Sequence, residues 1–335
     1  MLPPSPSILA ASMPRRVHRA ALGIGSVLMT LSALVPSVHA DSVLNGGFET
    51  PVVPVGSFAH VLGGQTVGAW TVVGTAVLLL QTGYAEPENG ISSFAAQAGL
   101  NSVDLTGYGN EGFTSGVEQT VQTTAGQAYH LSFFVGRASS ASPLYSAPAT
   151  VDLSINGGAR VGYTNAAVTP GTTNWKKFTT SFVATGSSTK ITFLNGTPAP
   201  ITEAGLDSVV LTPVFSEVGA GLAGVNGVPH LAGAGTLASG SAGSLSLTAA
   251  RPSSAAVLFM SLASTPTPFK GGTLIPVPTL LTLNMFTNGS GGIVLPFVWP
   301  SGMPPATSIY FQYAIQDAAA VKGVALSNGL KGITP

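Results

Sequence analysis

The feature that most constrains the fold of this chain is an alternation of apolar and polar side chains that recurs between residues 44 and 212. Successive side chains of a β-strand point to opposite faces of the sheet, so this period is typical of strands with one buried face. Turn residues such as Asn156-Gly157-Gly158 and Asn195-Gly196 separate the runs and supply the positive φ angles that hairpins need. No helical period runs over a useful length, and about ten strands at this spacing predict an all-β antiparallel sandwich.

Composition favours a folded β-protein over a disordered chain. The 335 residues include 42 glycines and 25 prolines, and only 7% are charged, but 45% are hydrophobic. Disorder accompanies low hydrophobicity, so this composition indicates strands joined by tight turns. Cysteine is absent from the sequence, which excludes disulfides, thiolate metal sites and a cysteine nucleophile.

The first forty residues have the pattern of an export signal. Three arginines between residues 15 and 19 form a basic region, an apolar run follows from 20 to 35, and Val38-His39-Ala40 suits cleavage after Ala40. The run is shorter than the roughly 20 residues of a spanning helix, and Pro36 interrupts it, which argues against a membrane anchor. We therefore expect residues 1–40 to be a cleaved signal peptide and the mature chain to be secreted, extracellular and without a membrane span.

The mature chain is almost neutral. Removal of the signal takes three of the twelve basic residues and none of the twelve acidic ones, leaving nine minus twelve, a net charge of −3. Without a basic patch to neutralise phosphates, nucleic acid is not expected as a partner. We expect the mature protein to be a monomer.

A change in composition divides the mature chain into two parts. Residues 215–229 are mostly small, which is typical of a linker or of a loosely packed first strand. A second strand-rich block then runs to residue 335, and proline-rich breaks separate its candidate strands at 244–249, 255–262, 280–286, 293–297 and 309–314. The sequence thus predicts one β-domain at 41–214 and a C-terminal β-sandwich, immunoglobulin-like or related, at 230–335.

Six short motifs occur in the first domain in a fixed order. They are Leu44-Asn45-Gly46-Gly47-Phe48-Glu49, Gly68-Ala69-Trp70, residues 117–121, residues 126–133, Trp175 before the run 178–184, and residues 205–211. Over residues 42–214 this order resembles the galactose-binding-like jelly rolls of the DUF642 and choice-of-anchor C group, which are related to the carbohydrate-binding modules of families 4, 9 and 22. The resemblance implies a jelly roll whose first and last strands lie side by side, and a function in binding carbohydrate.

The resemblance also implies a structural Ca²⁺ ion held by Glu49 and Asp207. Asp207 shares its strand parity with Val209 and Leu211, so we expect it to face a core, where a carboxylate needs a partner or a metal. Oxygen ligands suit a hard cation such as Ca²⁺. The alternative is that Asp207 accepts hydrogen bonds from turn amides and that no ion binds.

Aromatic side chains in loops are the candidate contacts for a sugar, because the C–H faces of sugar rings stack on aromatic rings. We predict six ligand-binding residues in or next to loops rich in glycine, serine and asparagine: Tyr84, Tyr108, Asn110, Glu111, Phe113 and Tyr145. The alternative is that these aromatic residues only anchor their loops. Trp70 and Trp175 are expected to be core residues.

Catalytic motifs are missing from the sequence. His60, His130 and His230 lie far apart in the mature chain, His130 is expected to face solvent, and the neighbouring Glu86 and Glu88 fit a solvated loop better than a hydrolytic pair. We therefore expect a secreted, non-catalytic protein that binds a cell-wall polysaccharide or an exopolysaccharide. The alternative is a structural matrix or surface-layer protein that acts through protein–protein contacts.

Overall fold

The computed structural model describes residues 43–201 and 203–335, so the predicted signal peptide lies outside it. Nearly all regular structure in these residues is antiparallel β-strand, apart from two short 3₁₀ helices, η1 (Pro87–Asn89) and η2 (Pro143–Tyr145). The all-β prediction is confirmed. Within the described ranges, no helix has the length and apolar character needed to cross a membrane.

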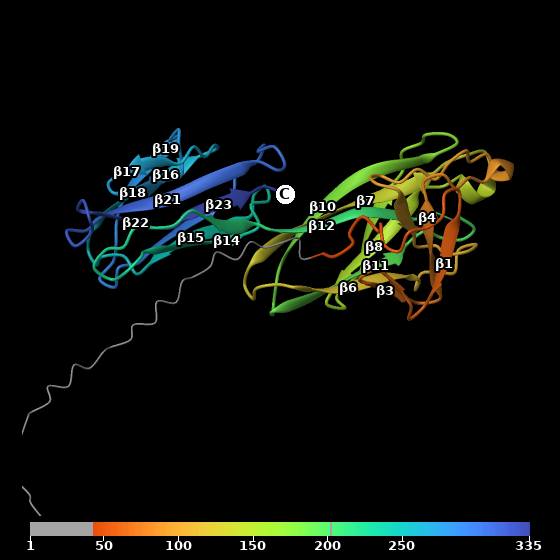
Figure 1. The fold of residues 1–335 in the computed structure, drawn as a ribbon, viewed down its shortest axis with the longest axis horizontal. Helices are drawn as coiled ribbons and strands as arrows, with labels where there is room; N and C mark the ends of the chain where they lie inside the picture. Colours follow the sequence, from red (N-terminus) through yellow and green to blue (C-terminus); the bar gives the residue numbers. More distant parts are fainter. Residues whose placement is uncertain (1–42, 202) are drawn as a thin grey trace, which may run out of the picture. The chain divides into compact units, whose positions relative to one another are not determined.

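Two six-stranded sheets form the first part of the molecule, here called the N-terminal sandwich (Figure 1). Sheet A has the order β1 (Phe58–Leu62), β4 (Ala76–Gln81), β5 (Asn101–Asp104), β12 (Gly205–Pro213), β7 (Ala128–Ala138) and β10 (Thr173–Val183). Sheet B has the order β2 (Thr66–Val67), β3 (Trp70–Val73), β6 (Gly116–Gln122), β11 (Ser188–Asn195), β8 (Ala149–Ile155) and β9 (Val161–Asn165). From β6 onwards most connections cross between the two sheets, as in a jelly roll.

The core between sheets A and B is built from the side chains that the alternation places inward. Phe133 of sheet A and Phe193 of sheet B meet with ring centroids 4.8 Å apart, and Trp70 lies 6.0 Å from Phe193. Trp70 is fully buried, as expected. Trp175 is half-buried instead, and its Nε1 donates to the carbonyl of Ala95 in a covering loop.

The first of the six motifs, residues 44–49, joins the two ends of the N-terminal sandwich through backbone contacts. The amide of Val209 in β12 donates to the carbonyl of Gly46 (2.9 Å), and a Cβ atom at Gly46 would collide with the carbonyl of Val209. The indole of Trp70 donates to the carbonyl of Asn45 (3.0 Å). The start and the end of the N-terminal sandwich therefore lie side by side, as the resemblance implied.

The second part of the molecule, here called the C-terminal sandwich, contains strands β13 to β23. Its larger sheet has the order β13 (Phe215–Val218), β23 (Gly329–Ile333), β21 (Ser308–Gln316), β16 (Ala255–Ser261) and β19 (Leu281–Phe286), with β22 (Val324–Leu326) paired to β21. The smaller sheets are β14 (His230–Gly235), β15 (Ala242–Thr248) and β20 (Ile293–Val298), and the hairpin β17 (Thr267–Phe269) with β18 (Gly272–Leu274). Leu245, Leu258 and Tyr313 are among the residues of its core.

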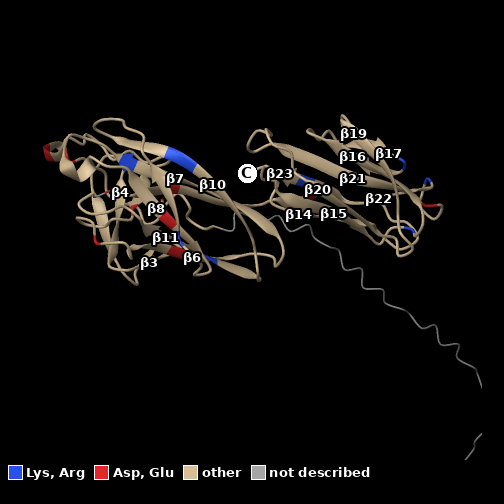
Figure 2. Ribbon diagram, turned by 180° about the vertical axis from the view of Figure 1, so that it is seen from behind, with Lys and Arg blue, Asp and Glu red and all other residues tan. Residues whose placement is uncertain are grey.

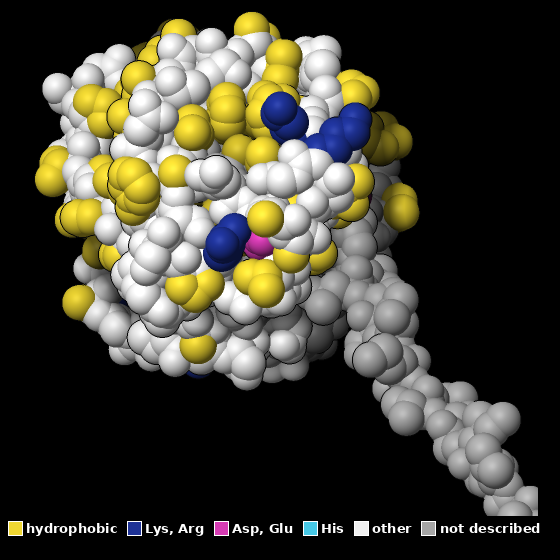
Figure 3. All heavy atoms as spheres, turned by 90° about the vertical axis from the view of Figure 1, so that its left-hand side faces the viewer, with side chains coloured by type: hydrophobic (Ala, Val, Ile, Leu, Met, Phe, Trp, Pro, Cys, Tyr) yellow, Lys and Arg dark blue, Asp and Glu magenta, His cyan; other side chains and the backbone are white. Residues whose placement is uncertain are grey.

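Charge is distributed unevenly between the two sandwiches. Residues 43–214 contain nine acidic and five basic residues, whereas residues 215–335 contain two acidic and four basic ones. Figure 2 shows the acidic positions, in red, mostly on the N-terminal sandwich. Figure 3 shows one face of the C-terminal sandwich, on which hydrophobic side chains, in yellow, are interspersed with polar atoms.

Candidate functional site

Five aromatic rings form a continuous row on the side of sheet A that faces away from the sandwich core. Leu78 and Leu80 of β4 pack with these rings, whereas Val77 and Leu79 of the same strand belong to the core. The centroid distances along the row are 6.4, 5.0, 5.5 and 5.9 Å, in the order Tyr108, Phe58, Tyr84, Phe94 and Tyr145. The structure therefore brings together three tyrosines that the sequence placed in separate loops.

Tyr108 is the exposed end of this aromatic row, with 69% of its surface accessible. His60 lies beside it, with 6.3 Å between the ring centroids. Glu111 holds both groups, because its Oε1 accepts from the backbone amide of Tyr108 (3.3 Å) and lies 3.1 Å from Nε2 of His60. Its Oε2 is buried and has no hydrogen-bond partner among the described residues. The result is an exposed aromatic ring with an imidazole at its side.

Asn110 serves the loop rather than the open surface. Its Nδ2 donates to the carbonyls of Thr197 (3.1 Å) and Ile201 (2.6 Å), and its Oδ1 accepts from Asn195 Nδ2 (3.1 Å). Phe113 is half-exposed, and its carbonyl accepts from Arg160. Phe113 makes no ring contact with the aromatic row in the described part of the chain, so the structure does not bring it to Tyr108. A ligand role for either residue stays a prediction.

Tyr145 is the buried end of the aromatic row, with 3% of its surface exposed. Its hydroxyl donates to Glu86 Oε2 (2.7 Å), and the hydroxyl of Tyr84 donates to Glu86 Oε1 (3.0 Å). Burial, and then the neighbouring Glu86, raise the pKa of Tyr84. Glu86 therefore fixes two rings of the row, which is the loop-anchoring role that the sequence left open for Tyr84 and Tyr145.

Two buried carboxyl groups, which sequence reasoning missed, lie on sheet A near this row. Asp104 is paired with Leu78 in the β4–β5 register and accepts from the amides of Thr106 and Ala204, both at 2.9 Å. Glu203 accepts from the Thr173 hydroxyl (3.0 Å) and from the amide of Ala138. Burial raises the pKa of Asp104 to about 7 and that of Glu203 to about 8. A charged residue between the apolar Val103 and Leu105 was the available sequence signal for Asp104.

Glu49 and Asp207 lie close to each other but face backbone amides. Asp207 Oδ2 accepts from Gln97 N (2.9 Å) and Ala98 N (3.2 Å), and Oδ1 accepts from Ser208 N. Both carboxylate oxygens of Glu49 accept from Leu100 N, at 3.0 and 3.1 Å. N–H groups occupy the positions that a cation would need, so this donor set does not fit Ca²⁺. No group of three potential metal-ligating side chains occurs within residues 43–201 and 203–335.

The burial of Asp207 has a different cause from the one expected. Strand parity does not run through it, because the β12–β7 register shifts between Asp207 and Val210 and Ser208 has a φ of 51°. Asp207 and its neighbour Leu206 are both fully buried. Burial raises the pKa of Asp207 to about 6, although the amides of Ala98, Ser208 and Gln97 oppose this shift. The geometry favours the hydrogen-bonded alternative, and calcium stays a prediction.

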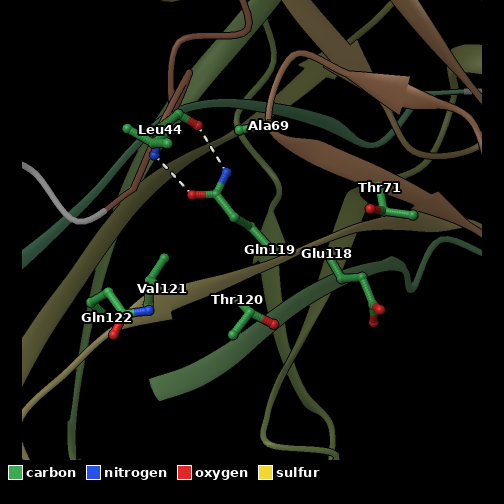
Figure 4. A pocket seen from close by; sticks show the side chains of 8 residues that line it. All are labelled: Leu44, Ala69, Thr71, Glu118, Gln119, Thr120, Val121 and Gln122. Atoms are coloured by element: carbon green, nitrogen blue, oxygen red, sulfur yellow. Dashed lines mark hydrogen bonds between the residues drawn. The ribbon is translucent and has the colours of Figure 1, made fainter. Parts of the chain in front are cut away.

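A hollow of about 510 Å³ lies beside strands β3 and β6, but its lining carries no aromatic ring (Figure 4). Gln119 reaches across to Leu44, accepting from its amide and donating to its carbonyl, both at 2.8 Å. Glu118 is paired with Lys190 (3.1 Å). Gln119 and Glu118 are thus engaged with the protein itself, and this hollow is a weaker candidate than the aromatic row.

The three histidines of the described chain do not form a catalytic group. His60 lies next to Glu111, and His230 lies 2.7 Å from Glu217 in the C-terminal sandwich. His130 was expected to face solvent, which is wrong: it is buried, with Nδ1 2.8 Å from Ser181 Oγ and Nε2 2.9 Å from the carbonyl of Ile333. The C-terminal strand covers it, which strand parity within β7 could not reveal.

Comparisons with known proteins identify the family. A search of curated proteins found no match. Among solved structures, a family 35 carbohydrate-binding module from Clostridium thermocellum is 18% identical, with 43% of this chain and 92% of that chain covered and a TM-score of 0.28. The CBM22-1 xylan-binding domain from Paenibacillus barcinonensis Xyn10C is also 18% identical, with 48% and 97% covered and a TM-score of 0.28. These low scores carry no argument about function.

The sequence profile of the family described as "Protein of unknown function (DUF642)" matches residues 41–210, which is half of the chain. The matched segment contains all but the last residue of the six motifs that carry the resemblance. The predicted resemblance is confirmed, and the chain belongs to the DUF642 family.

Proposed function

We propose that this chain is an exported, non-catalytic carbohydrate-binding protein that engages a polysaccharide outside the cell through Tyr108 and the groups beside it. The predicted signal peptide supports export, and the low share of charged residues, 7% of the chain, suits an uncharged ligand. The protein acts as a monomer in this proposal. We assign the protein no catalytic role. The two carboxylates beside the aromatic row, Glu111 and Glu86, are both engaged in holding neighbouring aromatic groups.

The exposure of Tyr108 is the observation that carries this proposal. An aromatic ring that only anchors a loop is expected to be buried, as Phe94 and Tyr145 are in the same row. Tyr108 instead keeps 69% of its surface exposed while Glu111 fixes its backbone. Because the backbone of Tyr108 is already fixed, little conformational entropy is lost when its ring binds the C–H face of a sugar. The imidazole of His60 at its side can form a hydrogen bond with a sugar hydroxyl.

Binding of soluble polysaccharides to the mature protein, measured by affinity electrophoresis and by pull-down on insoluble ones, tests this site. We expect Tyr108→Ala to weaken binding at least tenfold. Loss of the stacking and hydrogen bonding of one ring should reduce the binding free energy by about 1.4 kcal/mol or more. Tyr108→Phe should retain most of the affinity, since the ring remains. Phe286→Ala, which removes an exposed ring from the C-terminal sandwich, is the matched control.

Equal binding by the wild type and Tyr108→Ala would contradict the Tyr108 site. Failure of every tested polysaccharide to bind would contradict the carbohydrate-binding function itself.

A structural role through protein–protein contacts is the second candidate. Strands β19 and β20 are the edges of their sheets and expose Phe286, Val294 and Val298. Exposed apolar edge strands are templates for pairing with another chain. Assembly that grows with protein concentration in sedimentation velocity, without glycan binding, would favour this candidate over the first.

A further inference from the structure

A separate cavity of about 290 Å³ lies at the other end of the aromatic row. Its walls include Arg137 and Ser139 at the end of β7, Tyr145 and Ser146 in and after η2, and Val168 and Pro170 in the segment between β9 and β10. We call it the Arg137 pocket. Its volume is close to the lower limit of small-molecule sites, about 300 Å³, which suits a ligand of about one sugar ring.

Arg137 is a buried cation without an anionic partner. Only 6% of its surface is exposed, and it forms no salt bridge with any described residue. Its Nη1 donates to the carbonyls of Ala166 (2.6 Å) and Ala167 (3.3 Å), and its Nη2 donates to the carbonyl of Ser146 (3.4 Å). Its Nε is buried without a hydrogen-bond partner among the described residues. The carbonyls position the guanidinium but do not neutralise its charge, whereas buried charges in proteins are normally paired.

Ser139 supplies a second unused donor to the same cavity. Its side chain is 3% exposed, and its Oγ has no hydrogen-bond partner among the described residues. The backbone of Ser139 is fixed, because its carbonyl accepts from the amide of Gly171 (2.8 Å). The Arg137 pocket therefore combines a fixed positive charge with an unpartnered hydroxyl and an unpartnered N–H.

We propose that the Arg137 pocket binds the carboxylate of a small acidic ligand, of the class of a uronic acid. A carboxylate provides the missing negative charge, and its two oxygens can accept from the guanidinium and from the Ser139 hydroxyl. Tyr145, Val168 and Pro170 add an apolar wall that suits the C–H face of a sugar ring. A single cation with such a wall favours a monovalent carboxylate over a phosphate.

This site goes beyond the proposed Tyr108 site and does not depend on it. Glu86 connects the two, because it accepts from both Tyr84 and Tyr145, but Tyr108 itself does not line the Arg137 pocket. A failure of polysaccharide binding at Tyr108 therefore leaves uronate binding at Arg137 measurable, and the reverse also holds.

Isothermal titration of the full mature protein at constant ionic strength tests the ligand class, with sodium glucuronate, glucose, sodium acetate and phosphate as the four probes. We expect saturable binding of glucuronate and at least tenfold weaker binding of glucose, which has the ring without the carboxylate. Acetate, which has the carboxylate without the ring, should bind more weakly than glucuronate, and this arm separates an acidic sugar from a simple carboxylate. Glucose or phosphate binding as tightly as glucuronate would overturn the proposal.

Three variants locate the binding. Arg137→Gln removes the charge and should weaken glucuronate binding at least tenfold. Ser139→Ala removes a hydroxyl that has no hydrogen-bond partner among the described residues, so the fold should persist while the affinity falls several-fold. Phe286→Ala, which removes an exposed ring from the C-terminal sandwich, should bind glucuronate as the wild type does. If Arg137→Gln does not fold, Ser139→Ala decides, and wild-type affinity in that variant would overturn the proposal.

Discussion

The two sandwiches of this protein both pack β-sheets around an apolar core, but they bury different numbers of ionisable side chains. The N-terminal sandwich buries three carboxyl groups with raised pKa values, Asp104, Glu203 and Asp207, together with Arg137. The C-terminal sandwich buries one carboxylate, Asp317, which accepts from the amides of Val225 (2.8 Å) and Ala319 (3.0 Å). It exposes apolar side chains on its edge strands instead.

This difference indicates where function lies. Buried ionisable groups destabilise a fold unless they are satisfied, so a region that retains several of them around loops is a candidate for binding. In the N-terminal sandwich, Arg137 lines the Arg137 pocket, and Asp104 is paired with Leu78, which packs with the aromatic row. The C-terminal sandwich has no comparable cluster within its described residues.

The largest expected effect tests whether the two regions unfold separately. Trp70→Ala should lower the stability of the N-terminal sandwich by about 3–5 kcal/mol, because it removes a fully buried ring that contacts Phe48 and Phe193. Tyr313→Ala should have a similar effect on the C-terminal sandwich. Differential scanning calorimetry should show two transitions, with each variant shifting one. A single transition that both variants lower equally would contradict the predicted boundary near residue 214.

The buried carboxyl groups predict a pH dependence of stability for the N-terminal sandwich that the C-terminal sandwich should not share. The folded N-terminal sandwich keeps protons on Asp104 (pKa about 7) and Glu203 (pKa about 8) that the unfolded chain releases near pH 4. Its free energy of unfolding should therefore fall as the pH rises to about 8, by about 1.4 kcal/mol per unit of pKa difference. His130, whose pKa is lowered by burial, acts in the opposite direction at acid pH, so the test uses denaturant unfolding between pH 7 and 9.

Asp104→Asn and Glu203→Gln should each flatten this pH dependence. The transition of the C-terminal sandwich is the internal control, since the carboxyl groups with raised pKa values in the described chain all lie before residue 214. Most of the change between pH 7 and 9 should come from Glu203, because Asp104, with a pKa of about 7, is already about half ionised at pH 7. A wild-type N-terminal transition that is independent of pH in this range would mean that Glu203 is ionised in the folded state.

The sequence was sufficient for the architecture because strands and hairpins are local patterns. Alternation located most long strands, and the motif order located the family. Contacts between distant segments were not predictable. The hydrogen-bond contact between His130 and the carbonyl of Ile333 joins residues 203 positions apart. The aromatic row from Tyr108 to Tyr145 depends on how several loops fold together. Arg137 carried no sequence signal, because a strand arginine next to Gly136 gives no indication that its partner is missing.

A smaller effect separates the two explanations for Glu49 and Asp207. Because both accept from backbone amides, we expect EDTA to leave the melting temperature unchanged, while Asp207→Ala lowers stability by about 1–3 kcal/mol by leaving buried N–H groups unpaired. A calcium ion bound at a hundredfold excess over its Kd would stabilise the fold by about 2.7 kcal/mol. Loss of several degrees in EDTA by the wild type, with little response from Asp207→Ala, would support calcium.

Two exposed rings, Tyr108 in the N-terminal sandwich and Phe286 in the C-terminal one, should contribute least to stability. Substituting either by serine should change the free energy of unfolding by no more than about 0.5 kcal/mol, because both rings are mostly in solvent. The variants should therefore differ in what they bind, with Tyr108→Ser losing polysaccharide and Phe286→Ser unchanged in the same assay. If Phe286→Ser instead alters the sedimentation coefficient at high concentration, the edge formed by β19 is an assembly surface. In that case the N-terminal sandwich binds the ligand, and the C-terminal sandwich forms contacts with other protein chains.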